Sequence, residues 1–239
     1  MGSKPINMKY LLITLFALPF YLSSQIYDNY KVAVINDIDG YTFIRSGQGT
    51  NTPIIDSLFE GEFFQFLTTD TSDWYKVYKM WNVNGFVHKS RIKDIKTFNR
   101  TEQQKLITSI FNKEKEVYQK RISNNDYNRE LALYHDEKFD AILDLFIFYM
   151  NKKFDEKLMR DYFDILIIEK GSADELPSLA LGEIFIKHPN EVIKLVKEYN
   201  NEIITSHLDF GYLSAKFYHK NDMYFKDIDK QIEELKNEK

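Results

Sequence analysis

The chain has 239 residues, which is enough for one large domain or two small ones. Its aromatic content of 15%, with 19 Phe and 16 Tyr, can fill a substantial core and argues against intrinsic disorder. The net charge of −4 leaves no basic surplus, so binding to nucleic acid is not expected. Cysteine is absent, which excludes a thiol nucleophile, a disulfide framework, a thiolate metal site and a lipidated cysteine.

The N-terminal segment has the pattern of a secretory signal peptide. A lysine is followed by an apolar run from Tyr10 to Leu22 and then by two serines. The run is shorter than the roughly 20 residues that a bilayer span needs. We expect residues 1–24 to be a signal peptide, with residues 1–7 either an upstream start or a non-native leader. An uncleaved anchor and a buried helix are the alternatives. The prediction is an exported protein, periplasmic or extracellular in the cell envelope, that meets the membrane only through this segment if it stays uncleaved.

Alternation of apolar and polar residues predicts a small β domain at residues 31–94. From Tyr41 to Arg45, successive side chains point to opposite faces, as in a half-buried strand. Segment 46–53, rich in glycine and ending in proline, predicts a long turn, and the Asn84-Gly85 pair predicts the turn of the last hairpin. Strands are expected at residues 31–35, 41–45, 54–58, 63–67, 74–80 and 85–88. Short strands at this density favour a barrel.

Five short motifs of this domain follow the order of a known family. They are Ile44-Arg45-Ser46-Gly47-Gln48-Gly49-Thr50, Pro53-Ile54-Ile55, Glu60-Gly61-Glu62, Trp74-Tyr75-Lys76-Val77 and Gly85-Phe86-Val87-His88. Together they resemble the bacterial SH3-type domain (SH3b), a β-barrel of exported envelope proteins and cell-wall enzymes. Gln48 stands where the family has proline, and Phe43 where it has asparagine. The resemblance spans residues 32–94, about a quarter of the chain. It implies an SH3-like barrel that binds a cell-wall peptide or an extended protein segment.

Aromatic residues of the barrel supply the candidate ligand contacts, because SH3-type barrels bind extended peptides in aromatic-lined grooves. The candidate ligand-binding residues are Tyr41, Tyr78, Trp81, Phe86 and His88. For Tyr41 and Phe86, burial in the core is the alternative. Trp81 is expected in a hairpin loop, where burial is difficult, and is therefore predicted to contact the ligand. Arg45 is expected to brace the adjoining turn, and Trp74 to have a structural role.

The second half of the chain has a different character. After Ile92, glycine and proline become rare and the apolar period changes from two to three or four, which predicts an all-α domain at residues 99–239. Thr101-Glu102-Gln103-Gln104 has capping-box spacing, and Asp155 is predicted to cap a later helix. Residues 139–150 are apolar nearly all round, so their helix should be central. The fold class is therefore α+β multidomain: a small SH3-like β-barrel followed by an all-α helical bundle or short α-solenoid.

The sequence contains no recognisable active-site motif. No two of the five histidines have the i, i+4 spacing of helical zinc ligands, and no Gly-x-Ser-x-Gly or phosphate-binding loop occurs. His135-Asp136-Glu137 invites a metal or acid–base interpretation, but its position at an expected helix start explains it as ordinary capping. We therefore expect a non-enzymatic protein with no catalytic residue, no metal and no cofactor.

These patterns lead to an expectation of an exported cell-envelope binding protein. Its SH3-like module would bind a cell-wall peptide or an extended protein segment, and its helical domain would be a scaffold or a second binding surface. Two alternatives remain. One is a periplasmic adaptor or inhibitor that acts through the helical domain, and the other is a cell-wall hydrolase with an unfamiliar helical catalytic domain.

Overall fold

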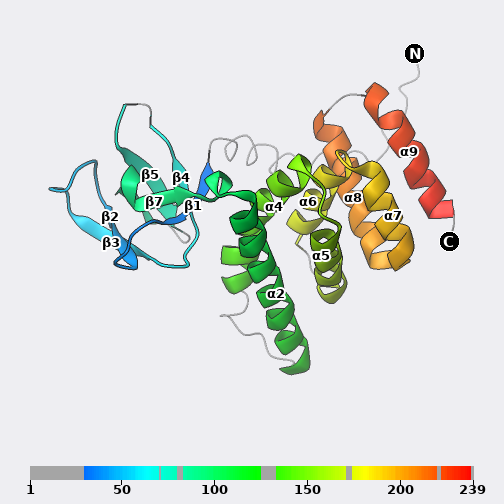
Figure 1. Ribbon diagram of the computed structural model, residues 1–239, viewed down its shortest axis with the longest axis horizontal. Helices are drawn as coiled ribbons and strands as arrows, with labels where there is room; N and C mark the ends of the chain where they lie inside the picture. The colour runs from blue at the N-terminus through cyan, green and yellow to red at the C-terminus, as the bar shows by residue number, and fades with distance from the viewer. Residues whose placement is uncertain are drawn as a thin grey trace, which may run out of the picture. The chain divides into compact units, whose positions relative to one another are not determined.

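A computed structural model describes residues 30–69, 71–79, 83–124, 133–170, 174–219 and 222–237 (Figure 1). The chain divides into two compact units, Met1–Asp94 and Ile95–Lys239. The described part of the first is a β-sheet and that of the second is helical, so the predicted order of a β domain and a helical domain is confirmed. The predicted signal peptide lies outside the described residues. Within those residues, no helix is both long enough and apolar enough to cross a bilayer.

The described part of the β domain forms one antiparallel sheet of seven strands. They are β1 Lys31–Ile35, β2 Tyr41–Arg45, β3 Ile54–Phe59, β4 Phe64–Leu67, β5 Trp74–Lys79, β6 Val83–His88 and β7 Ile92–Asp94. Their order in the sheet is β3-β2-β6-β5-β4-β1-β7. Although it is first in the sequence, β1 pairs with both β4 and β7. The first six strands fall at predicted positions, whereas β7 was not predicted.

The two faces of the sheet differ in burial. On β2, Thr42 and Ile44 are buried, whereas Tyr41 and Phe43 are 42% and 38% exposed. The predicted alternation of this strand is therefore confirmed. The buried face forms a core from Ala33, Ile44, Leu58, Phe64, Phe66, Val77, Val87 and Ile92. The opposite face keeps large aromatic side chains in solvent.

Gly85 lies inside β6 and not in a turn. Asn84 pairs with Tyr78 and Gly85 with Val77, so both residues lie within the β5–β6 ladder. The predicted Asn84-Gly85 turn is therefore wrong. A Cβ atom at Gly85 would lie 2.4 Å from Cγ2 of Ile44 and 2.6 Å from the carbonyl oxygen of Arg45. The glycine is needed because β6 approaches β2 closely at this point.

The described part of the second unit contains seven α-helices. They are α2 Arg100–Asn124, α4 Asp140–Lys152, α5 Glu156–Ile168, α6 Leu176–Phe185, α7 Pro189–Tyr199, α8 Glu202–His219 and α9 Asp222–Asn237. A π-helical segment, His135–Phe139, leads directly into α4. Helix α2 packs against α4 and α5, α4 against α6, α6 against α8, and α7 against α9. Helices α4, α6 and α8 thus form a row of helices that are two elements apart in sequence (Figure 1).

Side chains cap the starts of α2 and α5, as at α8, where Oδ1 of Asn201 accepts from the backbone N–H of Ile203 at 2.9 Å. At α2, the carboxylate of Glu102 accepts from the backbone N–H of Asn99 at 3.0 Å, and Oδ1 of Asn99 accepts from the N–H of Glu102 at 3.0 Å. This reciprocal capping box begins at Asn99, two residues before the predicted Thr101, because Arg100 is already helical. At α5, Oδ1 of Asp155 accepts from the N–H of Leu158 at 3.1 Å, which confirms the predicted cap.

Helices α6 and α8 meet at two glycines. A Cβ atom at Gly182 would lie 2.1 Å from the carbonyl oxygen of Gly211, and one at Gly211 would lie 1.9 Å from the carbonyl oxygen of Ser178. Beside this contact, Nδ1 of His207 lies 2.7 Å from Oγ of Ser178. The two backbones therefore approach more closely than any residue with a side chain would allow at these positions.

We expect stability to depend on pH through His207. Burial lowers the pKa of His207 below its ordinary 6.5, against the opposing charge of Asp174. Near pH 6.5 the His207 side chain therefore binds a proton in the unfolded chain but not in the folded chain. The stability that is present above this pH is lost as the pH falls towards the pKa of His207 in the folded chain. The loss is at most about 1.4 kcal/mol per pH unit for one group. Urea unfolding at a series of pH values should show it, and the dependence should be weaker in His207→Gln. If the free energy of unfolding of wild type and of His207→Gln changes with pH in the same way, His207 is not the source of the dependence.

Candidate ligand-binding site

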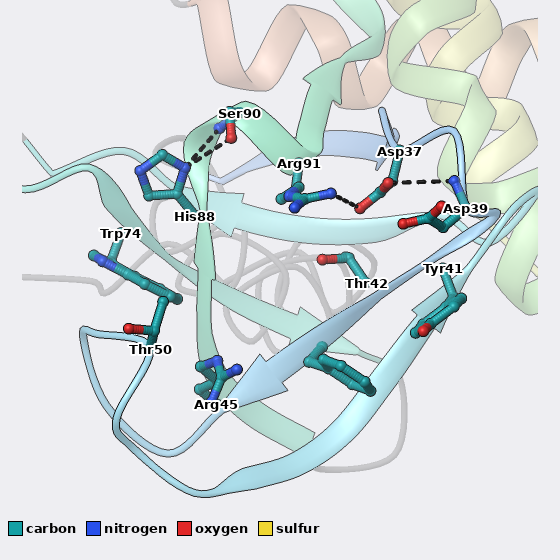
Figure 2. A pocket seen from close by; sticks show the side chains of 11 residues that line it. Asp37, Asp39, Tyr41, Thr42, Arg45, Thr50, Trp74, His88, Ser90 and Arg91 are labelled. Carbon is teal, nitrogen blue, oxygen red and sulfur yellow. Dashed lines mark hydrogen bonds and ion pairs between the residues drawn. The ribbon is translucent and has the colours of Figure 1, made fainter.

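A pocket of about 400 Å³ opens on the β domain (Figure 2). It lies over β2, the start of β5 and the end of β6, beside the loop that follows β1 and the loop that follows β2. Its lining residues are Asp37, Asp39, Tyr41, Thr42, Phe43, Arg45, Thr50, Trp74, His88, Ser90 and Arg91. The pocket therefore combines aromatic rings with charged groups of both signs.

Strand pairing creates the aromatic part of the pocket. Trp74 and His88 are directly opposed in the β5–β6 ladder, and their ring centroids are 5.5 Å apart in an edge-to-face arrangement. On β2, the rings of Tyr41 and Phe43 also meet edge to face, with centroids 5.3 Å apart. Since residues two apart on a strand share a face, Tyr41, Phe43 and Arg45 all reach the pocket. Half-exposed rings of this kind offer flat apolar surface to a ligand.

The charged groups lie on two sides of the pocket. Figure 2 shows Asp37, Asp39 and Arg91 along one side and Arg45 on the other. Arg91 forms an ion pair with Asp37, whose other oxygen accepts from the backbone N–H of Asp39 at 3.3 Å. Oppositely charged groups of a ligand could therefore be held at opposite sides of one pocket.

Arg45 also fixes the loop beside the pocket. Its Nη1 donates to the carbonyl oxygen of Thr52 at 2.7 Å, which confirms the predicted brace. Oγ1 of Thr52 in turn lies within hydrogen-bond distance of the carbonyl oxygens of Gly47, at 2.9 Å, and Gly49, at 2.8 Å. Loop 46–53 is thereby held against β2, so the side of the pocket that this loop forms is already in place before a ligand binds.

The structure brings some of the predicted ligand residues together and separates others. Tyr41 and His88 line the pocket, whereas Tyr78 and Phe86 are half-buried and do not line it. Tyr78 packs edge to face on Tyr30, with centroids 4.9 Å apart. Trp81 lies outside the described residues.

One aromatic residue that lines the pocket was not predicted as a ligand contact. Trp74 matches a strand tryptophan of the resembled family and was therefore predicted to be structural, yet it lines the pocket. Trp74 is paired with His88 in the β5–β6 ladder, and directly opposed residues share a face of the sheet. This pairing indicates that Trp74 lies beside the predicted ligand residue His88. Phe43 was likewise visible as the residue two positions after Tyr41.

A second group of ionisable side chains lies inside the helical domain. Nδ1 of His135 is 2.7 Å from Oε1 of Glu114 and 3.8 Å from Oε1 of Glu169. Its Nε2 is 3.1 Å from Oδ2 of Asp174 and 3.7 Å from Oδ1 of Asp140. Asp136 and Glu137 lie in the first turn of the π-helical segment, as predicted for acids near a helix start, but the side chain of His135 contacts buried carboxylates and does not act as a cap.

The electrostatics of this cluster are strongly perturbed. Burial alone would lower the pKa of His135, but hydrogen bonds to Asp174 and Glu114 raise it to about 11. Burial raises the pKa of Asp140 to about 8, with help from the charge of Asp174, and it raises the pKa of Glu169 to about 9. For Asp174, burial is outweighed by the hydrogen bond from His135, which lowers the pKa. Protons thus neutralise part of the cluster at neutral pH.

Comparison of the chain with protein-family models, curated proteins and solved structures finds no match. Function is therefore argued from the two groups of side chains themselves.

Proposed function

We propose that the chain is an exported cell-envelope protein whose β domain, an SH3-like barrel, binds a cell-wall peptide or an extended protein segment in the pocket of Figure 2. The observation that carries this proposal is the combination of the exposed rings of Tyr41 and Phe43 and the half-buried ring of Trp74 with charges of both signs. An extended peptide offers apolar side chains to such rings and offers charged groups to Asp39 and Arg45. The helical domain would then be a scaffold or a second binding surface.

The strand next to the pocket adds apolar surface. Phe59 of β3 is opposite Tyr41 and is 52% exposed, and Ile54 is opposite Arg45 and is 50% exposed. The pocket therefore continues into an apolar strip along β2 and β3. A strip of this kind suits a ligand longer than one residue, which favours an extended segment over a small molecule.

Replacing Trp74 with alanine is expected to abolish most of the binding. A desolvated aromatic anchor contributes about 2 kcal/mol or more, which is roughly 30-fold in Kd. The chain from Gln25 onward would be mixed with insoluble peptidoglycan, and the bound fraction measured after pelleting. Tyr78→Ala is the matched control, because it removes an aromatic ring from the same strand but outside the pocket.

Two outcomes would contradict this reading. If the wild-type protein is not retained, the cell-wall version of the proposal fails. A peptide array then tests the extended protein segment, and binding there must again be lost in Trp74→Ala. If Trp74→Ala and Tyr78→Ala weaken retention equally, the pocket is not where the ligand binds.

A second candidate function is favoured by an apolar stripe on α8. Phe210, Leu213 and Phe217 are 41%, 53% and 48% exposed, and their spacing places them on one side of the helix. Such a stripe suits a partner protein, as in an adaptor or inhibitor that acts through the helical domain. Leu213→Asp should then abolish capture of a partner by the whole chain while leaving peptidoglycan retention unchanged. Equal capture by both proteins would remove this candidate.

A further inference from the structure

The buried cluster around His135 gathers four carboxyl groups on one imidazole from separate segments of the helical domain. Glu114 comes from α2, His135 from the π-helical segment, Asp140 from the start of α4, Glu169 from the end of α5, and Asp174 from the approach to α6. The side chains of Glu114 and Glu169 are only 0% and 2% exposed. Burial of so many acids around one base is costly unless a proton or a cation compensates their charge.

Three of these carboxylates have a buried oxygen without a hydrogen-bond partner. In the part of the chain that the structure describes, these atoms are Oε2 of Glu114, Oδ1 of Asp140 and Oε1 of Glu169. Buried carboxylate oxygens are normally satisfied, so each of these requires an explanation. A cation bound between the carboxylates of Glu114 and Glu169 would supply an interaction for these two groups.

The spacing of the donor atoms suits one metal ion. Oε1 of Glu114 and Oε1 of Glu169 lie 2.7 and 3.8 Å from Nδ1 of His135. All three residues offer ligand atoms within 4.8 Å of one another. Bonds of about 2.0–2.2 Å to a tetrahedral zinc ion would place ligand atoms about 3.4 Å apart. A bound ion would therefore replace the proton of the 2.7 Å hydrogen bond between His135 and Glu114 and move these two atoms slightly apart.

The hydrogen bond at the other ring nitrogen of His135 is also the one expected of a metal-binding histidine. With Nδ1 directed at the two glutamates, Nε2 lies 3.1 Å from Oδ2 of Asp174. Asp174 is itself oriented, because its Oδ1 accepts from the backbone N–H of Leu176 at 3.0 Å. A histidine that binds metal through one ring nitrogen commonly donates its other N–H to a carboxylate in this way. The ring is also held by Phe139, whose centroid lies 5.2 Å away.

We propose that Glu114, His135 and Glu169 bind one divalent transition-metal cation of the Zn²⁺ class, with Asp174 orienting the imidazole. The mixed imidazole and carboxylate donors favour Zn²⁺ over Ca²⁺ or Mg²⁺, which prefer all-oxygen sites. Three protein ligands leave a further coordination position for water. Asp140 and Asp174, whose side chains are 21% and 22% exposed, mark the side of the cluster nearest to solvent. This inference is independent of the pocket in the β domain.

Calorimetric titration of the chelator-treated whole chain with ZnCl₂ tests the proposal. We expect saturable binding of one ion, and a higher Tm in its presence. Glu169→Gln should abolish that binding, and Asp174→Asn should weaken it by about 10- to 100-fold. Asp136→Asn is the matched control, because this exposed acid lies in the same segment and belongs to an alternative group with His135 and Asp140.

A second measurement does not depend on the folding of the variants. Wild-type protein loaded with Co²⁺ should show the visible absorption of a site with low coordination number, and Zn²⁺ should displace it. Absence of saturable binding to the wild type would overturn the proposal. The negative charge of the buried carboxylates would then be compensated by protons shared within the cluster. Equal binding by wild type and Glu169→Gln would also overturn it, as would a loss seen in Asp136→Asn but not in Glu169→Gln.

Discussion

Gly211→Ala is expected to destabilise the helical domain by about 3 kcal/mol or more. Added atoms in a packed interior usually cost about 1–3 kcal/mol when side chains can move aside. Here the new Cβ would meet the carbonyl oxygen of Ser178 at 1.9 Å, and a backbone atom cannot rotate away. Helices α6 and α8 would have to separate, which also strains the contact between His207 and Ser178. Urea unfolding followed by far-UV circular dichroism measures the change.

Two further variants make this experiment specific. Gly182→Ala inserts a Cβ from the opposite side of the same contact, 2.1 Å from the carbonyl oxygen of Gly211, so the two substitutions should not be additive. Ser206→Ala changes an exposed position of α8 and should stay within about 0.5 kcal/mol of wild type. If Gly211→Ala is as stable as Ser206→Ala, α6 and α8 do not approach as described.

Phe111→Ala is expected to cost about 3–5 kcal/mol, the range for removing a buried aromatic ring. Phe111 is fully buried in α2, and its ring contacts those of Phe139, Phe146 and Tyr162 at centroid distances of 5.9, 5.0 and 5.5 Å. The substitution would leave a cavity where α2 meets α4 and α5. The free energy of unfolding in urea gives the size of the effect.

The matched control for this prediction is Phe210→Ala. Phe210 has the same side chain on another helix but is 41% exposed, so its loss should cost much less. A similar cost for the two variants would show that the ring of Phe111 is not enclosed as described.

Much of the architecture could be predicted from local patterns. The alternation from Tyr41 to Arg45 and the cap at Asp155 depend on neighbouring residues, and both are confirmed. The error at Gly85 had a different origin. A glycine after asparagine usually serves a hairpin turn, whereas here it is required by Ile44 and Arg45, forty residues away in sequence. Sequence patterns do not show which distant backbone will pass that closely.

The candidate sites were less predictable for the same reason. Tyr41 and His88 were predicted as ligand residues and line the pocket. Trp74 was predicted to have a structural role because it matches a tryptophan of the resembled family, although its pairing with His88 places both residues on one face of the sheet. The cluster around His135 could not be recognised in the sequence, because Glu114 lies on α2 and Glu169 follows the end of α5. A helix-start pattern accounts for Asp136 and Glu137 but not for the side chain of His135, which is only 12% exposed.

The place of β1 in the sheet has a consequence for how the chain folds. Ala33 pairs with Asp94, so the sheet cannot be completed until about sixty further residues have left the ribosome. The row of α4, α6 and α8, by contrast, joins segments about half as far apart in sequence, as Gly182 and Gly211 are, and shorter separations favour faster formation. The half that is synthesised last is thus expected to acquire its structure first after dilution from denaturant. Both tryptophans, Trp74 and Trp81, belong to the slower half, so their fluorescence should lag behind the helical signal in refolding kinetics.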